Sequence, residues 1–274
     1  GRLVGRQPAP GTPVSTPGAA HASADWREVL RGSGAAPDAG TRQREARELD
    51  ASAAAPSASI PASAPPPTGI SIGGTQMPGQ HFAEAFDSLG AIAAAVASCT
   101  RCPLYSTATN PVPGEGNPDA NLVIVGEAPG ATEDEQGRPF VGAAGQLLTK
   151  ILAAVDLRRE DVFICNVLKH RPPGNRNPMP DEVTACSPYL VRQIELIRPK
   201  AILALGTFAA QTLLQTKLAI GKLRSQVHRY YGVPLIVTYH PAALLRNPSW
   251  KRPTWEYVQL VRRILHSASC ITHP

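Results

Sequence analysis

The sequence has no long apolar run and no secretion pattern. None of its 274 residues falls in a stretch that approaches the roughly 18 apolar residues a membrane-spanning helix needs. The amino end also lacks a basic segment followed by an apolar core and a cleavage site. We therefore expect a cytoplasmic protein with no membrane partner. The first residue is glycine rather than methionine, so the natural start is expected to be missing.

Large apolar side chains are scarce over residues 1–80, where Ala, Pro, Ser, Gly and Thr dominate. A segment of this composition cannot bury enough apolar surface to offset its loss of conformational entropy on folding. We therefore predict a disordered tail over residues 1–80 and one folded domain over residues 81–274. A solvated linker and a tether for a partner protein are both compatible with this composition.

Acidic residues are outnumbered by basic ones, but only modestly, since the formal net charge is +6. This excess is compatible with a polyanionic partner and does not establish one. Basic side chains in or beside predicted loops include Lys169, Arg171, Arg246 and Arg252. An ordinary solvated surface explains part of this placement.

Short apolar runs alternate with segments of helical periodicity, and no internal repeat is visible. The predicted strands are residues 121–126, 161–167, 200–205 and 234–239. The predicted helices are residues 82–97, 142–155, 181–197, 207–214 and 254–267, with Asp181 as the cap of the third. Strands separated by helices favour a parallel sheet covered on both faces. The fold prediction is an α/β protein, a three-layer α/β/α sandwich around a central four-stranded parallel sheet.

Polar side chains follow three of these strands. Glu127 follows the first strand, Asn166 ends the second and His240 follows the fourth. Because the carboxyl ends of parallel strands lie on one edge, these side chains are expected to face a common cleft. Phe140 lies in the Gly-rich loop after the first strand and is expected nearby.

Each of these residues also has a purely structural interpretation. Asn166 could tie a loop to the sheet, or its amide could donate and accept along one edge of a base. His240 could be an exposed or structural histidine, and Phe140 could fill the core instead of offering a stacking surface. Glu127 could serve the amino end of a helix or position a water molecule, and Glu133 could belong to a solvated acidic loop.

The cysteines form a spaced pattern. Cys99 and Cys102 make a Cys-x-x-Cys pair closed by proline, with His170 and Cys186 far along the chain. A redox pair, buried thiols and a metal site are all possible, and a cytosolic chain favours metal over a disulfide. Spacing alone does not choose between zinc and an iron–sulfur cluster. Cys165 lies in mid-strand and is expected to be a core thiol.

Four sequence blocks occur in a specific order. They are the early Cys-x-x-Cys, GEAPGATEDEQGRPFVGAAGQLL, NVLKHRPPGNRNP and IGKLRSQVHRYYGVPLIVTYHPAALLRNP. Over about residues 85–265 the chain resembles the family-four uracil-DNA glycosylases, the iron–sulfur branch of that superfamily. The resemblance implies hydrolysis of the N-glycosidic bond of flipped-out deoxyuridine in DNA, which releases uracil and leaves an abasic site for base excision repair.

The resemblance also implies roles for residues of the cleft. Phe140 would stack on the uracil ring, and Asn166 would pair with O4 and N3–H. Glu133 matches a position that walls off the 5-methyl group of thymine. His240 would donate to O2 as negative charge develops on the departing base.

The water and the scissile sugar would be held by Glu127 and by backbone groups of Ala128. Some relatives in the superfamily have Asp where this chain has Ala128. Direct carboxylate activation of water from that position is therefore excluded, and the mechanism must rely on leaving-group stabilisation and substrate strain.

DNA contacts follow from the same resemblance. The loop over residues 241–248 would enter the minor groove, with Leu244 or Leu245 as an apolar wedge. Phosphate contacts would come from Lys169, Arg171, Arg246 and Arg252. The partner would be uracil-containing DNA, single- or double-stranded, bound by a monomer of bacterial type near the nucleoid. The tail lies outside the resemblance, and a replication or repair protein is its possible partner.

The implied cofactor is a structural 4Fe-4S cluster held by Cys99, Cys102, His170 and Cys186. Typical members have Cys in place of His170, and Cys165 is the alternative fourth ligand. A related cluster-bearing protein that bonds covalently to its product also has His in this neighbourhood. Its basic insertion is absent here, so turnover is expected. The alternative function is a uracil-DNA-binding module that captures substrate covalently or without turnover.

Overall fold

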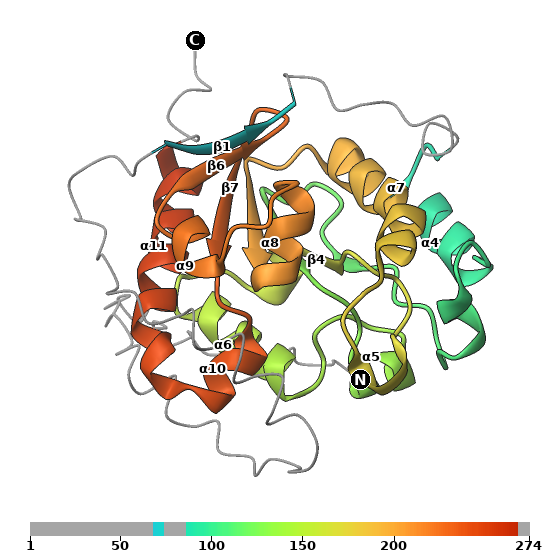
Figure 1. The fold of residues 1–274 in the computed structure, drawn as a ribbon. Coiled ribbons are helices and arrows are strands. Elements are labelled where there is room, and N and C mark those ends of the chain that lie inside the picture. Colours follow the sequence, from blue (N-terminus) through green and yellow to red (C-terminus); the bar gives the residue numbers. More distant parts are fainter. Residues whose placement is uncertain (1–67, 74–85, 268–274) are drawn as a thin grey trace, which may run out of the picture.

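One seven-stranded sheet organises the part of the chain that the structure describes. This structure is a computed structural model, and it describes residues 68–73 and 86–267. The strand order is β1-β6-β7-β5-β3-β4-β2 (Figure 1). The strands are β1 Thr68–Ile72, β2 Glu115–Gly116, β3 Leu122–Gly126, β4 Phe163–Asn166, β5 Ala201–Leu205, β6 Val227–Tyr230 and β7 Val233–Thr238. The four predicted strands are the contiguous parallel set β7-β5-β3-β4, so the predicted central sheet is confirmed.

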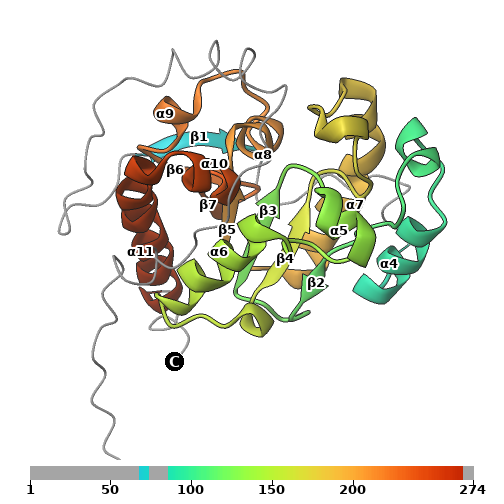
Figure 2. The same ribbon diagram turned by 90° about the horizontal axis from the view of Figure 1, so that it is seen from below.

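Helices cover both faces of this sheet. Alternate residues of β3 point to opposite sides, as the pleat requires. Val123 and Val125 share a core with α7 (Pro180–Ile197) and α8 (Thr207–Leu213). Leu122 and Ile124 share a second core with α6 (Ala143–Ala153) and α11 (Lys251–Ser267). The view from below shows these helices on both sides of the sheet, which confirms the three-layer prediction (Figure 2).

The predicted helices are present with adjusted ends. Helix α4 runs over Leu89–Ala97 and begins after Ser88, whose hydroxyl oxygen accepts the N–H of Ala91 at 3.2 Å. The first residues of the predicted helix 82–97 lie outside the described part. None of the helices in residues 86–267 is both long and apolar enough to cross a membrane.

The predicted cap of α7 is wrong. The cap residue is Met179, and Pro180 occupies the first helical position. The carboxylate of Glu182 accepts the N–H of Met179 at 2.8 Å, while Asp181 lies within the first turn. Proline suits the first position because its missing N–H would have no partner there in any case.

Three segments expected as loops contain short helices. They are α5 (Ala131–Gln136), α9 (Ile220–Leu223) and α10 (Pro241–Arg246). Helix α5 is anchored by the buried carboxylate of Asp134, which accepts the N–H of Thr109 at 2.9 Å. The acidic segment after β3 is therefore a short helix packed on the domain rather than a solvated loop.

The predicted tail is wrong for one short stretch. Residues Thr68–Ile72 form β1, which pairs in parallel with the edge of β6. The N–H of Ile70 donates to Nδ1 of the buried His228 at 2.9 Å. Ile70 and Ile72 barely change the average composition of residues 1–80, so the composition did not reveal this strand. Both side chains nevertheless pack against the core at the edge of the sheet. Residues 1–67 and 74–80 of the predicted tail lie outside the described part.

Candidate active site

The carboxyl ends of β3, β4 and β7 border one cavity of about 240 Å³. Six predicted residues line it: Glu127, Ala128, Glu133, Phe140, Asn166 and His240. The expected common cleft is therefore present. The cavity is also lined by Pro129, Gly130, Ala144, Pro172, Asn175, Arg176 and Ala242. The sequence analysis did not predict Asn175 and Arg176 as site residues. Both belong to the loop after β4, and only the polar, proline-rich composition of that loop could have indicated them.

Close packing at the end of β3 brings two side chains of the cavity together. A Cβ atom on Gly126 would lie 2.6 Å from Cζ of Phe140 and would also collide with Oδ1 of Asn166. Only glycine fits there, because both side chains lie directly against the main chain. The Phe140 ring and the Asn166 amide are thereby brought side by side.

The Asn166 side chain is buried and has an unpaired oxygen. The residue is 1% exposed, and its Oδ1 has no hydrogen-bond partner within the described residues. Leaving a buried acceptor unpaired costs roughly 1–3 kcal/mol. A ligand that brings an N–H into the cavity would satisfy this oxygen.

The tautomer of His240 is set by its place at the start of α10. Its Nδ1 accepts the N–H of Ala242 at 3.2 Å, so the proton of the neutral ring resides on Nε2. Burial, assisted by the positive charge of Arg246, lowers the pKa of His240 to about 4. The imidazole is thus neutral near pH 7 and has an N–H to donate. Its ring centroid lies 5.5 Å from that of Phe140.

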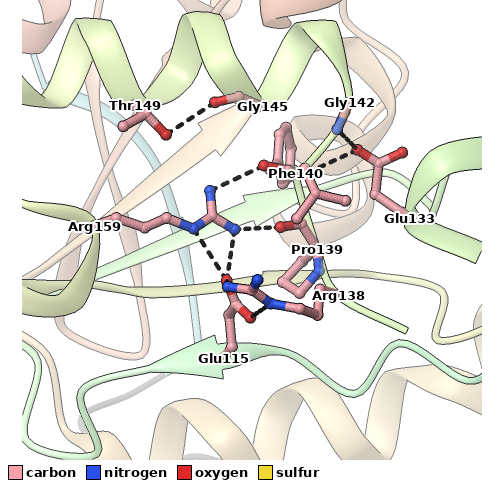
Figure 3. A network of polar contacts seen from close by, with 10 residues as sticks. Glu115, Glu133, Arg138, Pro139, Phe140, Gly142, Gly145, Thr149 and Arg159 are labelled. Carbon is pink, nitrogen blue, oxygen red and sulfur yellow. Dashed lines mark hydrogen bonds and ion pairs between the residues drawn. The ribbon is translucent and has the colours of Figure 1, made fainter. Parts of the chain in front are cut away.

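Two carboxylates border the cavity in different environments. Oε1 of Glu133 accepts the N–H groups of Val141 at 3.0 Å and Gly142 at 2.9 Å (Figure 3). Glu127 lies beside Ala128 at the end of β3, and burial raises the pKa of Glu127. Glu133 is therefore fixed to the loop that follows α5, whereas Glu127 has a carboxyl group that gives up its proton less readily.

The prediction that Lys169 contacts DNA is wrong. Its side chain is 1% exposed, and Nζ donates to the carbonyl of Asn166 at 2.9 Å and to Oε1 of Gln193 at 2.7 Å. The ammonium group supports the main chain of Asn166 from inside the domain. The remaining basic candidates do reach the surface. Arg246 and Arg252 are exposed, and the half-buried Arg171 donates to Oδ1 of Asn175 at 2.7 Å.

Leu244 and Leu245, the two candidates for the apolar wedge, differ in burial. Leu244 is 0% exposed and packs with Leu147 and Tyr239, so its prediction as a wedge is wrong. Leu245 is only partly buried. The segment 241–246 is helical, and successive helical residues point in different directions, which places Leu244 in the core while Leu245 keeps some exposure.

Three of the predicted metal ligands gather around α7. The thiols of Cys102 and Cys186 are hydrogen-bonded, and this contact lowers the pKa of Cys102. Cys99 has a similar contact with Tyr189, one turn along α7 from Cys186. His170 is 5% exposed, next to Lys169, whose backbone contacts the Cys186 sulfur. The donor set fits the thiolate chemistry of an iron–sulfur cluster.

Within residues 68–73 and 86–267, no three His, Cys, Asp or Glu side chains are arranged to hold a single metal ion. A cluster binds its protein ligands through different irons, so its ligands are spaced more widely than those of one zinc ion. Cys165 is 0% exposed within the core that includes α7, in agreement with its interpretation as a core thiol.

A parallel α/β sheet with an aromatic ring, a buried amide and a neutral imidazole at one cavity defines a protein that binds a flat, hydrogen-bonding ring such as a nucleobase. Residues 113–262 match the model of the uracil DNA glycosylase superfamily. The chain belongs to this superfamily, as the sequence blocks predicted.

The curated relatives agree. The chain is 51% identical over 170 residues to a Type-4 uracil-DNA glycosylase of Archaeoglobus fulgidus, covering 59% of this chain and 85% of the relative. It is 51% identical over 156 residues to the Type-4 enzyme of Thermotoga maritima, covering 56% and 81%. A Type-5 uracil-DNA glycosylase of Pyrobaculum aerophilum is 34% identical over 179 residues, covering 59% and 78%.

Proposed function

We propose that this protein is a uracil-DNA glycosylase that hydrolyses the N-glycosidic bond of flipped-out deoxyuridine and leaves an abasic site for base excision repair. The observation that carries the proposal is the buried Oδ1 of Asn166, which has no hydrogen-bond partner in the described part of the chain and lies at the cavity lined by Phe140 and His240. A base within a duplex cannot reach such a site, so it must leave the stack.

Recognition of uracil follows from the Asn166 amide. Its oxygen accepts N3–H and its NH₂ group donates to O4, while the Phe140 ring stacks on the base. Cytosine presents an acceptor at N3 and a donor at the 4-position, which would leave buried polar groups unpaired at a cost of roughly 1–3 kcal/mol. Uracil is therefore favoured over cytosine by the same amide whose Oδ1 has no partner among the described residues.

Bond cleavage depends on the departing base. As the glycosidic bond breaks, negative charge accumulates on O2 of uracil. The Nε2–H of His240 is the donor that stabilises this charge, because Nδ1 already accepts the N–H of Ala242. The imidazole donates to O2 as a neutral group, because its pKa of about 4 leaves Nδ1 without a proton near pH 7.

The attacking water is not activated from position 128, where alanine has no carboxylate. Glu127 and the backbone of Ala128 border the cavity and would hold the water and the sugar. The held carboxylate of Glu133 would exclude the 5-methyl group of thymine. Rate acceleration therefore relies on the leaving group rather than on a strong base.

DNA binding outside the cavity involves the surface candidates. Arg171, Arg246 and Arg252 would contact phosphates, and Leu245 would enter the gap left by the flipped nucleotide. The expected unit is a monomer on uracil-containing DNA. The segment before β1 would dock on a replication or repair protein.

The proposed cofactor is a structural 4Fe-4S cluster held by Cys99, Cys102, His170 and Cys186. Such a cluster, when bound, would cross-link the segment after α4, the loop after β4 and α7. None of its ligands lines the cavity, so the chain's own residues perform the chemistry.

The test is incubation of the protein with a single-stranded oligonucleotide that contains one deoxyuridine, beside a thymidine-containing control. Free uracil and an alkali-labile site are expected from the first substrate alone. A stable protein–DNA adduct would instead support the covalent-capture module. Binding without uracil release would also contradict the proposed hydrolase.

A further inference from the structure

The main chain of Phe140 has an unusual conformation. Its φ angle is 51°, in the left-handed region that bulky L-residues rarely adopt. Such a conformation persists only where the surroundings hold it. The Phe140 ring is 5% exposed and borders the cavity, so the unusual backbone sits directly behind a residue of the base-binding site.

Arg159 holds the carbonyl side of this segment. Its Nη1 donates to the carbonyl of Phe140 at 2.9 Å, and its Nη2 donates to the carbonyl of Pro139 (Figure 3). The Arg159 side chain is 19% exposed and comes from the turn Arg159–Asp161, just before β4. A planar guanidinium presents its N–H groups in a rigid fork, whereas the three N–H groups of an ammonium rotate and hold two adjacent carbonyls in no fixed geometry.

Glu115 holds Arg159 in turn. Its Oε1 accepts from Nη2 of Arg159 at 2.7 Å and from Nε at 3.0 Å, and Arg138 bonds the same carboxylate (Figure 3). Burial alone would raise the pKa of Glu115, but hydrogen bonds from Arg138 and Arg159 lower it below its usual value. The carboxylate therefore stays ionised, and the guanidinium of Arg159 keeps its orientation.

The opposite side of the segment is also held. Glu133 accepts the N–H groups of the two residues after Phe140. On α6, a Cβ atom at Gly145 would collide with the carbonyl group of Phe140, so the helix packs tightly on this peptide. Arg159 therefore bonds the carbonyls of residues 139 and 140, and Glu133 bonds the amides of residues 141 and 142.

We propose that Arg159, oriented by Glu115, is a positioning residue that fixes the left-handed main chain of Phe140 and so presets its ring for stacking on the base. This inference rests on the proposed function for the role of stacking. Arg159 does not line the cavity, and it acts on the reaction only through Phe140.

The kinetic test compares Arg159→Gln with Arg158→Gln. Arg158 is the adjacent guanidinium, 70% exposed and paired with Asp161 at 2.6 Å, and it serves as the matched control. R159Q should lower the single-turnover rate of uracil release by about 10- to 100-fold, because small misplacement of a positioning group has effects of this size. The DNA concentration for half-saturation should change little, and R158Q should stay within about twofold of the native protein.

A double-mutant cycle distinguishes positioning from general stabilisation. If Arg159 acts through the Phe140 ring, R159Q should cost little further rate in a Phe140→Ala background. An undiminished loss in that background, or a native rate for R159Q, would overturn the inference. Should R159Q fail to fold, Arg159→Lys provides the same comparison, because it keeps the charge beside Glu115 but loses the two-carbonyl fork.

A third measurement does not depend on activity. In protein labelled with 4-fluorophenylalanine, the Phe140 resonance is assigned by its loss in Phe140→Leu. R159Q or R159K should shift or broaden this resonance, while R158Q should leave it in place. Absence of uracil release by the native protein would defeat the proposed function. An unchanged Phe140 resonance in both Arg159 variants would defeat the positioning role by itself.

Discussion

Nδ1 of His240 accepts the backbone N–H of Ala242 at 3.2 Å, and this one contact determines which ring nitrogen carries the proton. It leaves Nε2 as the protonated nitrogen of a neutral ring. A histidine in solution would be largely protonated at pH 5. His240 is not, because burial and Arg246 lower its pKa to about 4.

The pH dependence of uracil release should reflect this low pKa. The single-turnover rate is expected to show no His240 ionisation near pH 6.5 and to lose the contribution of neutral His240 only as the pH falls through about 4. Rates at saturating DNA from about pH 3.5 to about pH 8 provide the measurement. Arg246→Gln should move this ionisation to higher pH, since a neighbouring positive charge is removed; an unchanged profile would contradict the electrostatic cause.

The same ionisation affects stability with a definite sign. The folded-state pKa of His240 lies below its unfolded value of 6.5, so the unfolded chain takes up the proton first. This contribution to the free energy of unfolding is complete above pH 6.5 and is lost as the pH falls toward about 4. Urea titrations across this interval should show a smaller pH dependence in His240→Gln than in the native protein.

Asn166→Asp should reduce uracil release by roughly 10- to 100-fold, because the donor to O4 is replaced by an acceptor in a buried site. Single-turnover rates on a uracil-containing oligonucleotide measure the loss. Asn121→Asp is the matched control, an exposed amide at the other end of β3. Equal rates for N166D and the native protein would remove Asn166 from base recognition.

The neighbouring leucines of α10 should behave differently. Leu244→Ala deletes a side chain that is 0% exposed and should lower the free energy of unfolding by about 2–5 kcal/mol. Leu245→Ala should lower the melting temperature less than Leu244→Ala does, since Leu245 is only partly buried against the same core. It should also reduce release from duplex DNA more than from single strands, because only a duplex has a stack to refill. Equal losses on both substrates would argue against Leu245 as the wedge.

The salt dependence of DNA binding should distinguish the exposed Arg246 from the buried Lys169. Arg246→Gln should reduce the slope of log K against log salt concentration by about 1, as loss of one phosphate contact does. Lys169→Met should leave this slope unchanged and lower stability instead, since two buried acceptors lose their donor. Filter binding at several salt concentrations and thermal melts measure the two effects; a changed slope in K169M would place Lys169 at the DNA after all.

Iron content tests the cluster ligands. Native protein should be brown with an iron-to-protein ratio of about four. His170→Ala should lose iron, His170→Cys should retain it, and Cys165→Ala should also retain it because Cys165 is a core thiol. Visible absorption and metal analysis decide the outcome, and a colourless zinc protein would refute the cluster.

Local pattern was sufficient to predict the central sheet and most of the cavity. The strands β3, β4, β5 and β7 are each a short apolar run stopped by a turn or polar residue, and parallel strands must bring their carboxyl ends together. Glu127, Asn166 and His240 were therefore recognisable from position alone. The edge strands β1 and β2, and β6 beside β1, were not, because their pairing depends on tertiary context.

The missed details depend on the direction of individual side chains. Lys169 turns inward although its neighbours form a polar loop, and Leu244 turns inward because the segment after His240 is helical. Arg159 and Glu115 lie 44 residues apart and meet only because β2 pairs with β4. Nothing in the spacing of such residues indicates that they share a carboxylate–guanidinium contact behind the cavity.

The strand β1 determines where the chain can be shortened. A protein beginning after residue 80 would lose Thr68–Ile72 and leave the backbone N–H and C=O groups along one side of β6 without their partner strand. Bare sheet edges of this kind promote edge-to-edge association between molecules. Shortened proteins that begin just before residue 68 should stay dispersed at concentrations where those beginning after residue 80 precipitate, even if both cleave the same substrate.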